Sequence, residues 1–383
     1  MTAIAPREQH QPVPWTARLL GRWRDLRNRL VGDPGFQRFA AAFPLTRPVA
    51  RREAAALFDL CAGFVYSQVL FACVRLRLLD HVAAGPLPPD DLSRRLGLAP
   101  AAGLRLVRAA AALGLVEWRG GHVGLGMRGA ALRGNPGALA MIEHHGMLYR
   151  DLADPVALLR GEADPAQLSR FWAYAGATDA GATADAAAYT ALMAASQSLI
   201  AEDILDAYPV SGHRVILDIG GGDGTFLGAV HRRAPDARLM LFDLPAVAAL
   251  AAAKADRPDS LTIHPGSFRE EELPGGADLI TLIRVAHDHD DHVVRPLLGR
   301  IRRALAPGGT LMIAEPMAQS AAVAPMADAY FGLYLMAMGS GQARSPQTLE
   351  AMLRDSGFDD IRHHRTRRPL FTGLMTARRP KET

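Results

Sequence analysis

Two features of the sequence have residue types and spacing that could do chemistry: a His/Asp run near residue 287 and a glycine-rich loop near residue 220. His287 follows the apolar run Leu279–Val285, which predicts a buried strand. The carboxyl ends of parallel strands face the ligand crevice of an α/β sheet, so His287 is placed where a base could take a proton from a hydroxyl group. His289 and His292, in the same polar run, are interpreted as solvated loop residues.

The histidines of this run do not predict a metal site. His287 and His289 alternate along an extended segment, and the sequence shows no second cluster of ligand residues elsewhere. We therefore expect no metal.

The glycine-rich loop predicts a ligand-binding turn between a strand and a helix. Gly220, Gly222 and Gly224 follow the apolar run Val215–Ile219 and precede a helix expected to start near Thr225. Glycines let the backbone pass close to a ligand at the amino end of the helix. Thr225 stands where a dinucleotide fingerprint needs its third glycine, which argues against an NAD-dependent oxidoreductase. Asp218, just before the loop, suits a cationic ligand better than a phosphate.

A second acid follows the next expected strand, Leu239–Phe242. Asp243, with Leu244 after it, could accept two hydrogen bonds from a ribose diol. A lone aspartate after a strand is more often a helix cap. Together with the glycine-rich loop, however, Asp243 favours an adenosine ligand.

These residues, with the Ala306–Gly309 turn before the strand that ends at Glu315, resemble class I S-adenosylmethionine methyltransferases. Over about residues 54 to 378 the chain is similar to the small-molecule O-methyltransferases of the plant caffeate and bacterial antibiotic type. The resemblance implies an α/β fold: a Rossmann-like methyltransferase domain preceded by a mostly α-helical winged-helix dimerisation domain. It also implies S-adenosylmethionine as cofactor, S-adenosylhomocysteine as product, and a homodimer.

The same resemblance implies roles for individual residues. The glycine-rich loop would hold the methionine part of the cofactor, Asp243 the ribose, and the loop after the third strand the adenine. The catalytic residues would be His287, with Asp288 beside it and Glu315 orienting it. The cofactor residues would be Asp218, Gly220, Gly222, Gly224, Asp243, Leu244, Ser267, Phe268 and Arg284, and the substrate residues would be Met193, Tyr330, Tyr334 and Met338.

Three positions depart from the pattern of this family. Ser267 stands where the family usually has an aspartate in the adenine loop, and His289 replaces the tryptophan of its His-Asp-Trp-Asp motif. Ala343 stands where a second glutamate should flank the base. The loss of that carboxylate suggests an acceptor other than the usual phenol, or a base supported by one acid.

Within the family, the chain most resembles the hydroxycarotenoid O-methyltransferases of purple photosynthetic bacteria. The run Ala50–Gln68, the basic N-terminal arm and the missing glutamate carry this resemblance. It implies a role in carotenoid biosynthesis and photosynthesis, with an apolar hydroxylated acceptor. The methionines and aromatic residues of a helix expected over Ala327–Met338 suit an apolar substrate. Packing in the protein core is the simpler explanation of any such row of apolar residues.

Two other functions stay open at this stage. The first is methylation of an aromatic polyketide or phenol. The second is a DNA-binding regulator, since helices near Asp90 and over Ala101–Leu113, with a hairpin over Val116–Leu125, resemble a winged helix. The second helix has only Arg105 and Arg108 among alanines and leucines, which favours packing, so no nucleic-acid partner is expected despite the net charge of +4.

The 383 residues exceed what one core usually serves, so several parts are expected. We predict a basic amphipathic arm and linker over residues 1–50, a winged-helix domain over 51–135, a helical connector over 136–208 that contributes to the substrate site, and the methyltransferase domain over 209–383. Beyond the arm's helix, the stretch Gly32–Pro48 is expected to be a loose connector.

The arm has tryptophans and leucines at helical spacing between residues 15 and 30, with arginines at other positions. Such a helix can lie in a membrane interface or pack on a partner subunit, and the sequence favours neither. The apolar stretch Phe64–Leu79 is interrupted by Arg75 and Arg77 and is expected to be too short to span a membrane. With no signal-peptide pattern and two cysteines, a cytoplasmic protein is expected, peripheral at most on the cytoplasmic face of the inner or photosynthetic membrane.

Overall fold

A computed structural model of the chain describes residues 15–164, 166–172, 183–318, 325–368 and 372–381. It divides into two compact units, Met1–Leu70 and Phe71–Thr383.

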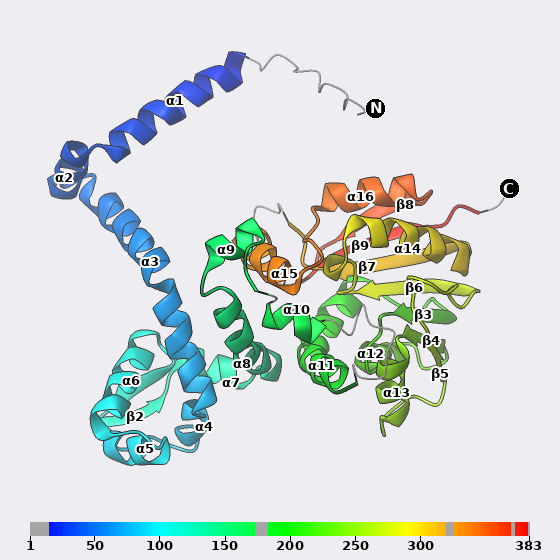
Figure 1. Cartoon of the computed structure of the whole chain (residues 1–383), viewed down its shortest axis with the longest axis horizontal. Coiled ribbons are helices and arrows are strands. Elements are labelled where there is room, and N and C mark those ends of the chain that lie inside the picture. The colour runs from blue at the N-terminus through cyan, green and yellow to red at the C-terminus, as the bar shows by residue number, and fades with distance from the viewer. Residues whose placement is uncertain (1–14, 165, 173–182, 319–324, 369–371, 382–383) are drawn as a thin grey trace. The chain divides into compact units, whose positions relative to one another are not determined.

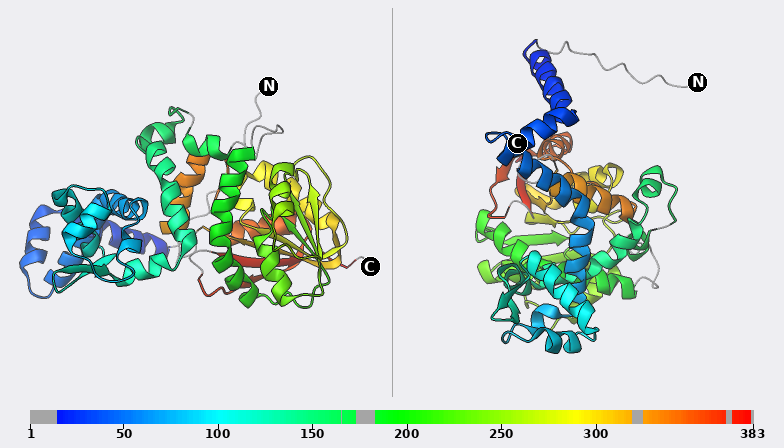
Figure 2. Two further views of the ribbon diagram at one scale, coloured as in Figure 1. Left: turned by 90° about the horizontal axis from the view of Figure 1, so that it is seen from below. Right: turned by 90° about the vertical axis from the view of Figure 1, so that its left-hand side faces the viewer.

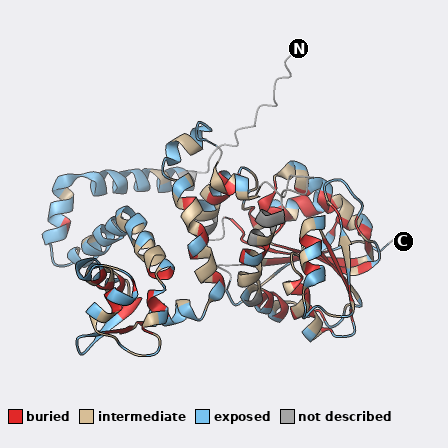
Figure 3. Ribbon diagram, turned by 60° about the horizontal axis from the view of Figure 1, so that its bottom comes forward, coloured by how far each residue is buried: buried red, intermediate tan, exposed pale blue. Residues whose placement is uncertain are grey.

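The first unit consists of helices with few buried residues (Figure 3). They are α1 (Trp15–Gly32), α2 (Pro34–Ala42) and the part of α3 (Arg47–Arg75) up to Leu70. Helix α2 shows that the expected loose connector is wrong. Asp33 caps α2 by accepting a hydrogen bond from the Phe36 amide at 2.7 Å, and Pro34 occupies the first turn, where its missing N–H costs nothing.

Helix α3 is longer than the apolar stretch expected from the sequence, because it starts at Arg47. A window of 18 residues within it has a mean hydropathy of 1.8 and is 11% buried. By length and composition, α3 could cross a membrane, so the expectation that this region is too short is wrong. Such a helix is weak evidence by itself, since the helices of soluble proteins pass the same test.

The second unit begins with the helix–helix–hairpin arrangement that the sequence predicts. The hairpin pairs β1 with β2 through Val116↔Leu125, and Gly103 lies so close to Ser93 that an added Cβ would be 2.0 Å from its hydroxyl oxygen. The second helix therefore packs tightly on the first, as a packing role requires. These elements are α4 (Leu78–His81), α5 (Pro89–Arg95), α6 (Pro100–Ala112), β1 (Val116–Arg119) and β2 (His122–Leu125).

A group of helices follows, as expected for residues 136–208. Gly137 of α8 packs against Ser196 of α11, where a Cβ would lie 2.5 Å from the Ser196 backbone. The sequence also predicts a turn around Gly176, which lies outside the described residues. The helices are α7 (Met127–Arg133), α8 (Pro136–Asp151), α9 (Pro155–Arg160), α10 (Gln167–Trp172) and α11 (Thr183–Ala207).

The last part of the chain forms a sheet of seven strands in the order β5-β4-β3-β6-β7-β9-β8 (Figure 1). The first five in this order are parallel, and β9 runs antiparallel to both of its neighbours. In the sequence, the runs Ile361–His364 and Leu370–Ala377 predict an antiparallel pair that closes the sheet. The expected start of the last strand at Leu370 lies outside the described residues. The strands are β3 (Val215–Ile219), β4 (Arg238–Asp243), β5 (Leu261–Pro265), β6 (Ala277–Ile283), β7 (Leu305–Glu315), β8 (Asp359–His364) and β9 (Gly373–Arg378).

Helices cover both faces of this sheet (Figures 1 and 2). Alternate strand residues belong to two cores: Leu217 and Ile219 pack in one, and Ile216 in the other. One core includes α14 (Asp291–Ala304) and α16 (Pro346–Asp355), and the other includes α11, α12 (Thr225–Arg233) and α13 (Pro245–Ala253). This is the predicted Rossmann-like architecture.

The helix expected over Ala327–Met338 is two segments. A π-helical segment, η4 (Pro325–Phe331), leads into α15 (Gly332–Met338). Wide π-turns often occur at functional sites.

Candidate active site

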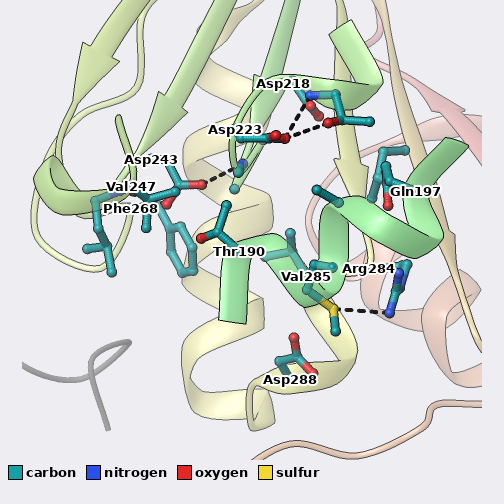
Figure 4. Close-up of a pocket in the computed structure, with 18 of the residues that line it drawn as sticks. Thr190, Gln197, Asp218, Asp223, Asp243, Val247, Phe268, Arg284, Val285 and Asp288 are labelled. Carbon is teal, nitrogen blue, oxygen red and sulfur yellow. Dashed lines mark hydrogen bonds between the residues drawn. The ribbon is translucent and has the colours of Figure 1, made fainter. Parts of the chain in front are cut away.

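A cavity lies at the carboxyl ends of the parallel strands, between the loops after β3, β4, β5 and β6 and helix α11 (Figure 4). Most of the residues predicted to bind cofactor line it, with Met193 and Asp288. Those lining residues are Asp218, Gly220, Gly222, Asp243, Leu244, Ser267, Phe268 and Arg284. His287, Glu315, Gly224, Tyr330, Tyr334 and Met338 lie outside the lining.

The loop after β3 has the backbone that its glycines require. Gly220, Gly222 and Gly224 have φ of 67°, 60° and 80°, in the left-handed region that residues with a side chain rarely adopt. A Cβ on Gly220 would lie 2.6 Å from a methyl group of Val285. Glycines are therefore needed here both for the turn and for the close approach of the backbone.

Asp243 is held at the end of β4 by two backbone donors. Its carboxylate accepts hydrogen bonds from the amides of Gly222 at 2.8 Å and Leu244 at 2.7 Å (Figure 4). Burial raises the pKa of Asp243 to about 6, and these donors only partly offset that effect. The acid thus joins the glycine-rich loop to the start of α13.

The neighbouring acid Asp218 is also buried. Burial raises its pKa to about 7, although the Thr281 hydroxyl donates to it at 2.6 Å. A third cavity acid, Asp223, is paired with Lys254 at 2.9 Å. Among the described residues, neither Asp218 nor Asp243 is paired with a cation, so a positively charged ligand would lower the cost of ionising them.

Arg284 ties the end of β6 to α11. Its guanidinium donates to Ser196 Oγ at 2.7 Å. It also contacts Met193 Sδ at 3.1 Å, the dashed line from Arg284 to sulfur in Figure 4. Its φ of 58° is unusual for a residue with a side chain, so the local backbone is strained. One residue therefore connects the predicted cofactor and substrate sides of the cavity.

His287 lies between two carboxylates on the short turn after β6. Its Nε2 is 3.1 Å from Asp288 Oδ1, and its Nδ1 is 3.6 Å from Glu315 Oε2. Glu315 also accepts a hydrogen bond from the His287 amide at 2.9 Å. Burial alone would lower the pKa of His287, but the two acids together raise it above its ordinary value. The structure therefore brings together the three residues predicted to form the catalytic group.

Arg344 holds the turn that carries His287. This buried guanidinium donates to the carbonyl oxygens of Ala286 at 2.6 Å and His289 at 2.7 Å, and to Asp291 at 2.8 Å. The sequence indicated Arg344 only as the neighbour of Ala343. A positioning role could not be inferred, because its partners lie more than fifty positions away along the chain.

His289 corrects the sequence interpretation. It is 5% exposed and lines the cavity, whereas a solvated loop residue was expected. Arg269 lies 3.3 Å from its Nδ1, and the rings of Phe268 and Trp172 pack around it. Burial, followed by the charge of Arg269, lowers the pKa of His289 to about 3. His292 is exposed, as expected.

The predicted substrate residues of η4 and α15 lie in an apolar cluster with α8 and α10. The hydroxyl group of Tyr334 is 2.8 Å from His144 Nε2, and that of Tyr330 is 2.7 Å from His145 Nε2. The ring of Phe331, beside Tyr330, meets the His287 ring edge to face at 6.0 Å. His144 and His145 were not singled out from the sequence, where they read as ordinary helix residues.

Comparison with known proteins identifies the family of the chain. The O-methyltransferase domain model matches residues 149–359, and the O-methyltransferase dimerisation domain model matches residues 58–125. The chain belongs to the O-methyltransferase family and is an S-adenosylmethionine-dependent enzyme. Its dimerisation domain supports a homodimer.

Two similar proteins are named demethylspheroidene O-methyltransferase. The one from Cereibacter sphaeroides is 45% identical over 92% of this chain and 94% of its own length, and the one from Rhodobacter capsulatus is 46% identical over 88% and 85%. The fold matches the crystal structure of human N-acetylserotonin methyltransferase, with a TM-score of 0.72 and 24% identity over 86% of this chain and 98% of that one.

Proposed function

We propose that the protein transfers a methyl group from S-adenosylmethionine to the hydroxyl group of a demethylspheroidene-like carotenoid, within carotenoid biosynthesis. The observation that carries this proposal is the high identity, over nearly the whole length, to two relatives that bear the name of that substrate. Methylation of an aromatic polyketide or phenol is the alternative, since an acetylserotonin O-methyltransferase of Mus musculus is 32% identical over 85% of the chain.

The cavity residues fit S-adenosylmethionine. The glycine-rich loop leaves room for a ligand against its backbone, and Asp218 is a buried acid suited to the cationic methionine end. Asp243 and Leu244 would hold the ribose, and Ser267 and Phe268 would border the adenine. Gly220, Gly222, Gly224 and Arg284 would complete the site.

When bound, the cofactor supplies an electrophilic methyl group on a positively charged sulfur. The acceptor hydroxyl would lie against Asp288, which faces the cavity, and His287 would take the hydroxyl proton at Nε2 as the new oxygen–carbon bond forms. Glu315, which bonds the His287 amide, would hold the ring and stabilise the imidazolium. The methyl group would come from the positively charged sulfur of the cofactor, which would keep the electron pair of the old carbon–sulfur bond.

The two carboxylates around His287 suit an aliphatic alcohol. Such a hydroxyl group holds its proton more tightly than a phenol does, and an imidazole with a raised pKa is a stronger base. Ala343 cannot supply a carboxylate, but Asp288 lies close enough to Nε2 to provide the second negative charge.

The acceptor would lie between the cavity and the apolar cluster of η4 and α15, against Met193, Tyr330, Tyr334 and Met338. Met193 reaches Arg284, while Met338 and the Tyr334 ring are buried with aliphatic side chains. An apolar wall of this kind would suit a polyene chain. We also propose the division into residues 1–50, 51–135, 136–208 and 209–383 as arm, dimerisation domain, connector and catalytic domain.

We further propose that a cytoplasmic homodimer contacts an anionic membrane through α1. Leu19, Trp23, Leu26 and Leu30 are all exposed, and Arg22, Arg27 and Arg29 are exposed among them. An apolar helix face with arginines along it fits the boundary between lipid headgroups and acyl chains. Packing of α1 on the partner subunit is the alternative that an experiment must exclude.

The test of the reaction is incubation with labelled S-adenosylmethionine and a panel of hydroxycarotenoids and phenols, followed by product analysis. The proposal predicts a methyl ether of the hydroxycarotenoid at a kcat/KM well above that for any phenol. Methylation of the phenols alone would overturn the carotenoid assignment, and no transfer to any acceptor would overturn the activity.

A further inference from the structure

The cavity contains a buried histidine to which the proposed reaction gives no role. His289 lines the cavity together with Ser267, Phe268 and Arg269 of the loop after β5. That loop crosses the carboxyl edge of the sheet, since Phe268 packs against His289 at 5.2 Å although β5 and β6 are separated by two strands. The Phe268–His289 contact therefore joins the loops that follow β5 and β6 in the wall of the cavity.

The contact with Arg269 fixes the hydrogen-bonding character of His289. A guanidinium group can only donate, so Nδ1, 3.3 Å from Arg269 Nη2, must be the acceptor nitrogen of the ring. In the neutral imidazole the hydrogen then resides on Nε2. Burial and the neighbouring cation both disfavour a second proton. His289 is thus a neutral ring with one defined donor.

That donor is available to a ligand. Within the part of the chain that the structure describes, Nε2 has no hydrogen-bond partner, and it is not among the polar atoms sealed in the interior without one. A nucleoside whose ribose is held at Asp243 would place its base one sugar ring away, in the part of the cavity bordered by Phe268 and Val247 (Figure 4). Adenine presents ring nitrogens that accept hydrogen bonds.

We propose that His289, held in one neutral tautomer by Arg269, binds the adenine of the cofactor by donating Nε2–H to a ring nitrogen. The inference rests on the proposed function for the identity of the cofactor. The adenine would then be recognised by a hydrogen-bond donor on the β6 side of the cavity. On the β5 side, Ser267 has no carboxylate that could accept a hydrogen bond from the amino group of adenine. Arg269 acts through His289 and is a positioning residue.

The test is titration calorimetry with S-adenosylhomocysteine, which needs no turnover. His289→Phe keeps an aromatic ring but removes the donor, and should weaken binding about five- to tenfold, the effect of one neutral hydrogen bond. His289→Gln restores a donor and should recover part of the affinity. Arg269→Met should weaken binding less than His289→Phe. His292→Phe, which changes an exposed histidine in the first turn of α14, is the matched control and should bind like the wild type.

Three analogues make the test specific to the adenine: the 1-deaza, 3-deaza and 7-deaza forms of S-adenosylhomocysteine, each lacking one ring nitrogen. One of them should bind the wild-type protein more weakly than S-adenosylhomocysteine does. The same analogue should bind His289→Phe as tightly as S-adenosylhomocysteine does, because the donor is already missing in this variant. The proposal would be overturned if His289→Phe and His289→Gln lost the same amount of affinity for S-adenosylhomocysteine. It would also be overturned if the analogue bound more weakly by the same factor to the wild type and to His289→Phe. Wild-type protein that binds the product but methylates no acceptor would instead contradict the proposed function.

Discussion

Nε2 of His287 lies 3.1 Å from Oδ1 of Asp288, while Nδ1 of the same ring faces Glu315 at 3.6 Å. An imidazole between two carboxylates holds its proton more tightly than a free one, and the pKa of His287 is raised although burial opposes this. The base that would accept the hydroxyl proton is therefore strengthened by the residue next to it in the chain. This relationship leads to a prediction about pH.

Asp288→Asn should move the acid limb of the pH–rate profile to lower pH. His287 must be neutral to accept a proton, so the rate rises as the pH rises through its pKa, which lies above the ordinary value. Removing the negative charge of Asp288 lowers that pKa, and the rise then begins at a lower pH. Single-turnover rates measured from about pH 5 to pH 9 would show the shift. Asp236→Asn, an exposed acid, is the control; an unmoved acid limb in Asp288→Asn would contradict the coupling.

Asp243→Ala should weaken S-adenosylmethionine binding by at least about tenfold. The carboxylate is held by the amides of Gly222 and Leu244, and its loss would remove a charged acceptor from two ribose hydroxyl groups, each such bond contributing about 1.5 to 3 kcal/mol. Titration calorimetry measures the affinity, with Asp236→Ala as control. An unchanged dissociation constant would remove Asp243 from the ribose site.

The arm should bind anionic vesicles through its arginines. Each arginine near such a surface contributes about 1 kcal/mol, so replacing Arg22, Arg27 and Arg29 by glutamine should lower partitioning roughly a hundredfold. Sedimentation with vesicles rich in phosphatidylserine measures this, and vesicles of phosphatidylcholine alone should bind both proteins weakly. The exposed pair Arg105 and Arg108 of α6, changed in the same way, is the control. Equal partitioning of the triple variant and the wild type would support packing of α1 on the partner subunit.

Tyr334→Phe should lower the free energy of unfolding by about 1 to 3 kcal/mol, because it leaves His144 buried without its hydroxyl partner. Chemical denaturation measures the loss. His144→Phe combined with Tyr334→Phe should cost less than the sum of the single changes, since both partners of one bond are then removed. Additive losses would show that the 2.8 Å contact contributes nothing to stability.

The fold and the cofactor side of the cavity could be predicted from the sequence because their signals are local. An apolar run followed by Gly220, Gly222 and Gly224 specifies a strand, a left-handed turn and a helix within a few positions. Asp243 follows its own strand in the same way. These local patterns needed no knowledge of which distant segments meet.

The residues that the sequence did not reveal depend on distant partners. His144 meets Tyr334 across 190 positions, and His289 is buried because a loop twenty positions earlier crosses the sheet edge to reach it. The helix α2 was missed for another reason: the glycines and prolines between residues 32 and 48 indicated a loose connector. The Asp33 cap and a proline in the first turn are nevertheless enough to start a helix.

The last prediction concerns the base. His287→Ala should lower the single-turnover rate of methyl transfer by about 10²- to 10⁴-fold, the usual contribution of general-base catalysis, while cofactor affinity stays nearly constant. Affinity should be spared because His287 does not line the cavity, in contrast to His289. An aliphatic acceptor should place the loss toward the upper end of that range, since its proton is harder to remove. His289→Ala should show the opposite pattern, with weaker binding and a smaller loss of rate at saturating cofactor. With folding checked by circular dichroism, a near wild-type rate for His287→Ala would show that positioning of the two reactants alone sustains the transfer.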